Sequence, residues 1–233
     1  MSRAAQMFPA AGLVIGIIGA LVLASGSMLQ LPVHAISVLA VTAMIVATGA
    51  LHEDGLADMV DGFGGGHEPK RKLEIMKDSH IGTYGVLALF LSQSLRVILI
   101  ASLLLRGLDL AITVLIASQM VSRGFCMFLW AGLPPARSNG LSKQAGQPQR
   151  QALRMALVTT SIILLCLLLP NLNIITILLA MVLSGLVSYL MILLCRRQIG
   201  GQTGDTIGAT QQLCDLAFMA GILISLGIAK DLL

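Results

Sequence analysis

Residues 174–195 read IITILLAMVLSGLVSYLMILLC, a stretch without a charged side chain. About 20 such residues in a helix cross the hydrocarbon core of a bilayer, which is about 30 Å thick. Similar stretches recur along the chain, which is 56% hydrophobic and only 11% charged, with a mean hydropathy of +0.90. A water-soluble domain could not bury that much apolar surface. The sequence therefore predicts an integral membrane protein.

The apolar stretches predict an all-α, polytopic bundle of about seven spans, because a bilayer offers no partner for free backbone N–H and C=O groups. No internal repeat or break in composition divides the chain, so residues 1–233 are expected to form one domain. Its four cysteines lie singly in apolar stretches, where packing is the expected role. The predicted spans are Phe8–Ser27, Leu31–Leu51, Tyr84–Leu105, Leu110–Trp130, Ala152–Leu169, Ile174–Cys195 and Ile207–Ala229.

Lys and Arg residues fall in alternate connections between the spans. Three polar loops, near 52–83, 132–151 and 196–206, carry most of them, whereas the opposite connections hold only Arg106 and Lys230. The positive-inside rule then places the N-terminus and these loops in the cytoplasm. The net charge of +4 is explained by anchoring residues that face anionic lipid, and it requires no nucleic acid. We expect a multi-pass protein of the inner (cytoplasmic) cell membrane.

Acidic residues are concentrated after the second predicted span. Seven of the eleven lie between Glu53 and Asp78, and Asp54, Asp58 and Asp61 share one face if this segment is helical. Three like charges repel one another unless a cation lies among them. Oxygen ligands without His or Cys favour Mg²⁺ or Mn²⁺, which bind carboxylates together with substrate phosphates. The alternative is a solvated helix end whose acids offset nearby lysines.

Other polar residues also indicate a site for an anion or a metal ion. Arg96 and Arg123 lie inside predicted spans, where a cation usually faces the bundle interior. Arg123 has three alternative partners: the acidic cluster, a phosphate, or Asp215. The 132–151 loop either covers an anionic ligand or is a plain connector. Residues 200–209, GGQTGDTIGA, combine backbone N–H groups near a helix N-terminus with Asp205, which suits an anion contact and a further metal ligand.

Taken together, four sequence blocks resemble the cobalamin synthase family, the adenosylcobinamide-GDP ribazoletransferases. Their order along the chain matches, and the resemblance covers nearly the whole sequence. One departure is His80, at a position where the family commonly has arginine. The four blocks are HEDGLAD at 52–58 with Asp61-Gly62, LEIMKDS at 73–79 with Gly82-Thr83, Ser122-Arg123-Gly124, and GGQTGDT at 200–206 with Gly208-Ala209.

The resemblance implies a Mg²⁺-dependent enzyme that joins adenosylcobinamide-GDP to α-ribazole or its 5′-phosphate and releases GMP. We expect Asp54, Asp58 and Asp61 to be catalytic and, with Glu53 and Asp205, to hold the metal. Other nucleotide-loop enzymes are expected partners that bind at the cytoplasmic face, and a homo-oligomer is an open alternative. The expected substrate contacts are Lys77, Asp78, Ser79, Thr83, Arg123, Thr203 and Gly204.

Other classes of membrane protein fit the sequence less well. A CDP-alcohol phosphatidyltransferase would carry D-G-x-x-A-R, whereas this chain continues DGLAD from Asp54 to Asp58. A polyprenyl transferase would carry D-D-x-x-D-type clusters in two loops. A transporter could place Arg96, Arg123 and Asp215 inside its spans, but it would show two inverted halves, which are not evident.

Overall fold

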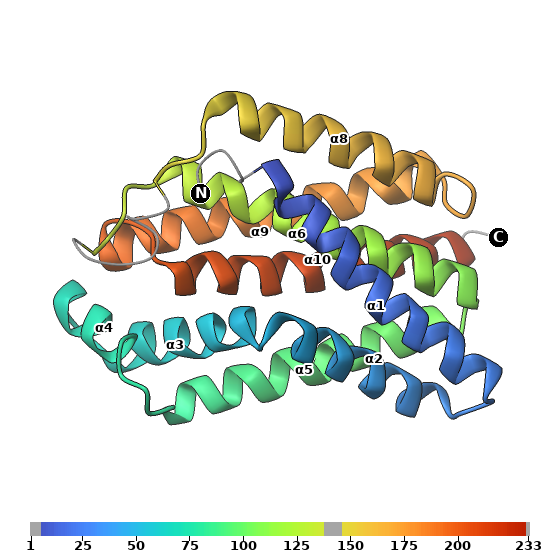
Figure 1. Cartoon of the computed structure of the whole chain (residues 1–233), viewed down its shortest axis with the longest axis horizontal. Helices are drawn as coiled ribbons and strands as arrows, with labels where there is room; N and C mark the ends of the chain where they lie inside the picture. The colour runs from blue at the N-terminus through green and yellow to red at the C-terminus, as the bar shows by residue number, and fades with distance from the viewer. Residues whose placement is uncertain (1–5, 138–145, 232–233) are drawn as a thin grey trace.

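The computed structural model describes residues 6–137 and 146–231, and the regular structure in these ranges is helical (Figure 1). The all-α class predicted from the sequence is confirmed. In chain order the helices are α1 (Phe8–Met28), α2 (Val33–Thr48), α3 (Leu51–Gly65), α4 (Pro69–Ile75), α5 (Thr83–Leu104), α6 (Leu108–Gly132), α8 (Arg150–Leu168), α9 (Ile174–Ile199) and α10 (Gly204–Asp231).

Most of these helices suit a bilayer. Within the described ranges, five are long and apolar enough to cross one: α1, α5, α6, α9 and residues Gly204–Gly227 of α10. α2 and α3 pass the same test only as a bent pair, and the apolar part of α8, Leu153–Leu168, is shorter than a typical span. Such a set of long apolar helices is typical of a multi-pass membrane protein, while the number of spans stays a prediction.

The second predicted span, Leu31–Leu51, is broken near its end. Gly49 and Ala50 both have positive φ, of 62° and 58°. The chain turns there through 88° before α3 begins at Leu51. A left-handed backbone is ordinary for glycine but unfavourable for a residue with a Cβ atom such as Ala50. The apolar residues of Leu31–Leu51 gave no sign of this turn, so the sequence predicted a helix that continued through it.

The segment near 52–83, predicted as a loop, is largely helical, and that part of the prediction was wrong. Leu56, Ala57 and Met59 of α3 are buried, and the helix packs against α5 and α10. Charge and glycine content suggested a loop, whereas burial of one apolar face stabilises a helix. The other two predicted loops are connections, and residues 138–145 of the 132–151 loop lie outside the described part of the chain.

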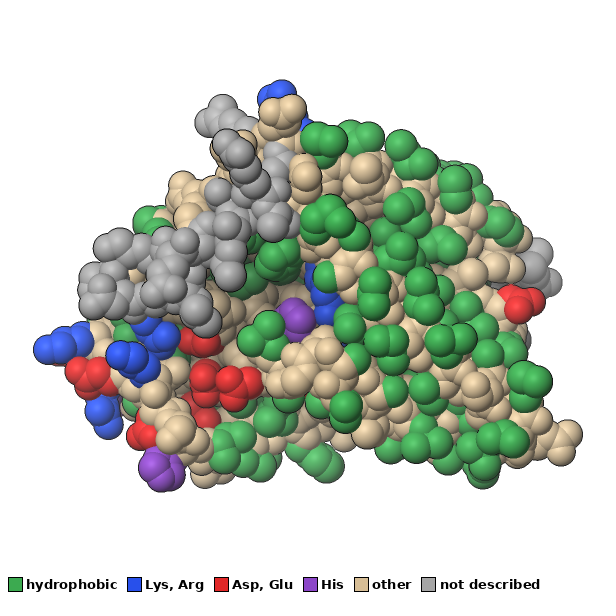
Figure 2. Space-filling model, in the orientation of Figure 1, with side chains coloured by type: hydrophobic (Ala, Val, Ile, Leu, Met, Phe, Trp, Pro, Cys, Tyr) green, Lys and Arg blue, Asp and Glu red, His purple; other side chains and the backbone are tan. Residues whose placement is uncertain are grey.

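α10 lies at the centre of the packing, in contact with α3, α5, α6 and α9. Figure 1 shows α3, α5 and α10 running alongside one another. Cys214, Phe218 and Ile222 of α10 are fully buried. Much of the outer surface carries exposed hydrophobic side chains (Figure 2), as expected where helices face lipid tails.

Glycines bring α1 into close contact with α6. A Cβ atom at Gly12 would lie 2.3 Å from the carbonyl oxygen of Gln119, and one at Gly16 would lie 2.7 Å from Cα of Ile116. Small residues four apart allow helix backbones to approach closely in membranes, where packing replaces the hydrophobic effect as the driving force. The backbones of α1 and α6 are thereby in close contact at Gly12 and Gly16.

Gly12→Ala is expected to lower the free energy of unfolding by about 1–3 kcal/mol, because the methyl group requires α1 and α6 to separate. Thermal unfolding of the detergent-purified protein measures the change. Gly227→Ala is the matched control, since a Cβ atom at Gly227 would meet no other atom within 4 Å. An equal melting temperature for both variants would show that the α1–α6 contact is looser than described.

Candidate active site

Asp54, Asp58 and Asp205 come together where α3 crosses the beginning of α10. The helices touch at Gly55, where a Cβ atom would lie 2.8 Å from the carbonyl oxygen of Asp205. Asp54 is exposed, while Asp58 and Asp205 are partly buried. The three carboxylates are close enough to repel one another. Figure 2 shows acidic side chains grouped at the end of the molecule that carries α3 and α4, with Lys and Arg beside them.

Asp61, one turn further along α3, is buried and holds the N-terminus of α5. Its Oδ2 accepts a hydrogen bond from the Gly82 N–H at 2.7 Å, and its Oδ1 accepts one from the Gly85 N–H at 2.8 Å. A Cβ atom at Gly82 or Gly85 would lie within 2.4 Å of this carboxylate. Asp61 thus satisfies backbone donors that begin a helix, as a capping residue does. This contact joins the acidic helix to the segment that follows α4.

The remaining predicted ligand, Glu53, has partners inside the bundle. Its Oε1 accepts hydrogen bonds from Arg96 Nη1 at 3.3 Å and from Gln212 Nε2 at 2.9 Å. In the described residues no three His, Cys, Asp or Glu side chains form a group able to hold a metal ion. A cation bound near Asp54, Asp58 and Asp205 would therefore take further ligands from water or substrate. Mg²⁺ commonly binds in this way, through one or two carboxylates and phosphate oxygens.

The predicted substrate contacts Lys77, Asp78, Ser79 and Thr83 are exposed and lie between α4 and the first turn of α5. The Asp78 carboxylate accepts hydrogen bonds from the His80 backbone N–H at 3.1 Å and pairs with the His80 ring at 2.7 Å. These hydrogen bonds keep the pKa of Asp78 below its ordinary value. Asp61 holds this segment beside α3 through Gly82 and Gly85.

Thr203 and Gly204 form the start of α10. The Thr203 N–H donates to Thr206 Oγ1 at 2.9 Å, and the Thr206 N–H donates to Thr203 Oγ1 at 3.3 Å. The Thr203 hydroxyl also donates to Asp205 Oδ2 at 3.2 Å. Thr203 is buried, whereas Gly204 is exposed at the N-terminus of the helix. The N-terminal end of a helix favours negative ligands, so Gly204 is the better placed of the two for a phosphate.

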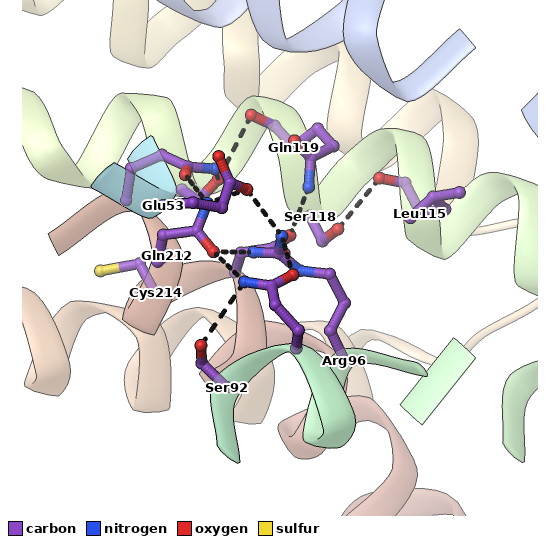
Figure 3. A network of polar contacts seen from close by, with 12 residues as sticks. Glu53, Ser92, Arg96, Leu115, Ser118, Gln119, Gln212 and Cys214 are labelled. Carbon is purple, nitrogen blue, oxygen red and sulfur yellow. Dashed lines mark hydrogen bonds and ion pairs between the residues drawn. The ribbon is translucent and has the colours of Figure 1, made fainter. Parts of the chain in front are cut away.

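A second polar cluster lies deep between α3, α5, α6 and α10 (Figure 3). Arg96 is buried and joins three helices: its Nη1 donates to Glu53, and its Nη2 donates to Gln212 Oε1 at 2.6 Å. Asp215 Oδ2 lies 3.0 Å from the same Nη2. Gln119 Nε2 donates to Asp215 Oδ1 at 2.8 Å. Charges at this depth are costly unless they are paired, and here they are.

Arg123 bonds to Gln119, which in turn bonds to Asp215, so the link between Arg123 and Asp215 is indirect. A phosphate contact of Arg123 stays a prediction. Its Nη1 donates to Gln119 Oε1 at 2.8 Å and to the Gln119 carbonyl at 3.1 Å. With His52 and Glu53, Arg123 lines a small cavity between the helices. The glutamines of this cluster, Gln119, Gln211 and Gln212, were not predicted from the sequence. Their presence in otherwise apolar stretches was the available signal.

Arg137 is the other residue whose contact was not predicted. The sequence shows it only as part of a basic loop, yet its Nη1 lies 3.4 Å from Asp205 Oδ2 and its Nη2 donates to the Leu73 carbonyl of α4 at 3.2 Å. It therefore stands between α4 and the acidic residues. Sequence spacing could not show these contacts, because Leu73 and Asp205 are each more than 60 residues from Arg137 in the chain and meet it only through tertiary packing.

Comparisons with known proteins agree over nearly the entire chain. The family profile described as cobalamin-5-phosphate synthase matches residues 1–223. An adenosylcobinamide-GDP ribazoletransferase of Azorhizobium caulinodans is 45% identical, with 96% of this chain and 85% of the relative covered. Proteins of the same name from Rhizobium etli strain CIAT 652 and Brucella ovis are 39% and 37% identical, with 97% of this chain and 87% of each relative covered. No solved structure matches the chain.

Asp61→Asn is expected to lower the free energy of unfolding by about 1–3 kcal/mol, because the amide keeps only one acceptor and places N–H groups against backbone donors. Asp54→Asn, on the exposed part of the same face, should melt like the unchanged protein. Thermal unfolding in detergent compares the two. An Asp61→Asn protein with unchanged stability would contradict the capping role.

Arg96→Met should destabilise the protein more strongly, by about 3–5 kcal/mol, because it leaves Glu53 and Asp215 buried without their cation. The triple change Arg96→Met, Glu53→Gln and Asp215→Asn is expected to recover part of the loss. Melting temperatures of both proteins test this, with the exposed Arg106→Met as control. Equal losses in the single and triple variants would mean that packing, not charge pairing, makes Arg96 important.

Proposed function

This chain belongs to the cobalamin-5-phosphate synthase family, and we propose that its chemistry takes place at the crossing of α3 and α10. The function is that of an adenosylcobinamide-GDP ribazoletransferase, which joins adenosylcobinamide-GDP to α-ribazole. The observation that carries the proposed location is the convergence of Asp54, Asp58 and Asp205 beside the exposed N-terminus of α10. We further propose that the reaction depends on Mg²⁺ and is the transfer of a phosphoryl group from GMP to a ribose hydroxyl.

In the proposed site, carboxylates bind the metal ion, and a helix N-terminus and a lysine bind the phosphates. One or two carboxylates of the set Asp54, Asp58 and Asp205 would hold Mg²⁺, with water and substrate oxygens completing its ligands. Bound there, the ion would offset negative charge on the diphosphate and on the departing GMP. Gly204 lies at the positive end of the α10 dipole, and Lys77 lies on the exposed segment tied to α3, so both are suited to contact phosphates.

In the proposed reaction a ribose hydroxyl of α-ribazole, or of its 5′-phosphate, attacks the phosphorus on the cobinamide side. A new O–P bond forms, the bond to the GMP oxygen breaks, and the hydroxyl proton passes to a carboxylate. Asp54 is the proposed acceptor, because it is exposed while both oxygens of Asp61 accept backbone hydrogen bonds. A proton acceptor in such a position typically contributes a rate factor of about 10²–10⁴.

The basic residues support a cytoplasmic site on the inner membrane. Lys70 and Arg71 lie on α4, and Arg196 and Arg197 lie in the last turn of α9. α4 packs on α9, where Lys72 bonds to Gln198, so these cations share one end of the bundle with the acidic helix. Cytoplasmic connections carry the excess of Lys and Arg in membrane proteins. We therefore propose that the substrates bind from the cytoplasm.

Purified protein with adenosylcobinamide-GDP, α-ribazole and Mg²⁺ should release GMP and form the joined corrinoid. Asp54→Asn is expected to reduce the turnover rate at least about a hundredfold without changing the melting temperature. EDTA should abolish product, and added Mg²⁺ should restore it. Liquid chromatography of GMP and corrinoid product measures all three.

Asp109→Asn is the control for this assay, because it removes an exposed carboxylate from the first turn of α6 and should leave turnover unchanged. Product formation that persists in EDTA would overturn the Mg²⁺ proposal. Full activity of Asp54→Asn would remove Asp54 from the chemistry but would leave the family assignment intact.

A further inference from the structure

Arg137 is held in place by backbone pairing between two connections far apart in sequence. The Ala136 N–H donates to the Gln202 carbonyl, and the Gln202 N–H donates to the Pro134 carbonyl, both at 2.8 Å. Gly201 permits this approach, since a Cβ atom there would lie 2.4 Å from the Pro134 oxygen. The segment after α6 is thus fastened to the segment before α10. The backbone of Arg137 follows directly on this paired stretch.

The guanidinium group then makes contacts with two further parts of the site. Nη2 donates to the carbonyl of Leu73, in the last turn of α4, where helix carbonyls lack partners within the helix. Nη1 forms an ion pair with Asp205 Oδ2 at 3.4 Å, longer than a direct charged hydrogen bond. Arg137 is also close enough to Asp58 to interact with it electrostatically. One cation therefore faces two of the three converging carboxylates.

Resting on the function proposed above, we propose that Arg137 is the built-in counter-cation of the acidic site and that a divalent cation replaces its charge there. Asp54, Asp58 and Asp205 repel one another, so the ligand-free protein needs positive charge beside them. The hydrogen bond to Leu73 keeps the guanidinium anchored, while the longer contact to Asp205 is the one that a metal would weaken. Arg137 is thus a positioning residue, acting through Asp205 and α4.

This role predicts a change in metal affinity in an unexpected direction. A cation about 4 Å from a carboxylate near the surface opposes the binding of a second cation, so removing it strengthens metal binding. Arg137→Met should therefore bind Mn²⁺ alone about five to ten times more tightly than the unchanged protein. Arg137→Lys keeps the charge, so its affinity should stay within about twofold of the unchanged value.

Titration of the detergent-purified proteins with Mn²⁺, with free Mn²⁺ followed by electron paramagnetic resonance, measures these affinities without substrate or turnover. Arg71→Met is the matched control, because it removes an exposed arginine of α4 that pairs with Glu74. Its affinity should equal that of the unchanged protein. Melting temperatures establish that each variant is folded.

The outcomes separate the role of Arg137 from the proposed function. Mn²⁺ binding that is lost in Asp54→Asn but unchanged or weakened in Arg137→Met would overturn the counter-cation role and leave the metal site standing. Equal tightening in Arg137→Met and Arg71→Met would also overturn it, because the effect would then be one of general surface charge. If the unchanged protein bound no Mn²⁺, the metal site and the role of Arg137 would fail together.

Discussion

The buried pairing of Arg96 with Glu53 and Asp215 is the interaction on which the arrangement of the bundle depends. Arg96 belongs to α5, Glu53 to α3 and Asp215 to α10, so one guanidinium joins the three helices that surround the candidate site. In an apolar surrounding each of these charges is unfavourable alone and tolerable only in the pair. The requirement that they meet therefore specifies how α3 lies against α5 and α10.

Close backbone contacts determine the rest of the geometry. Gly55 brings α3 onto the beginning of α10, and Gly82 and Gly85 bring the start of α5 onto Asp61. The first contact sets the backbone of Asp205 against α3. The second places the Asp61 carboxylate at the start of α5, where backbone N–H groups favour negative charge. The acidic helix is consequently held at both ends of its polar face. This explains how a short, charged helix belongs to a membrane bundle without crossing it alone.

Charge is distributed differently in the two polar regions of this ribazoletransferase. In the interior, Arg96 pairs with Glu53 and Asp215, and Gln119 and Gln212 add hydrogen bonds to this cluster. Near the surface, Asp54, Asp58 and Asp205 outnumber the cation that faces them, Arg137. With the buried Arg123, this cluster holds two cations and two anions, and such a balanced group is suited to holding helices together. An acidic excess that water can reach is suited to binding a cation and a phosphorylated substrate.

The sequence by itself determined the membrane environment, the all-helical class, the approximate helix positions and the family, because apolar length and short motifs are local properties. It also singled out Asp54, Asp58 and Asp205, the carboxylates of the candidate site. Only the tertiary structure decided that 51–65 is a helix, that Asp61 caps α5, that Glu53 turns to Arg96, and that Arg137 reaches Asp205. These outcomes depend on which side chains meet across helices, and residues distant in sequence carry no local signal of such contacts.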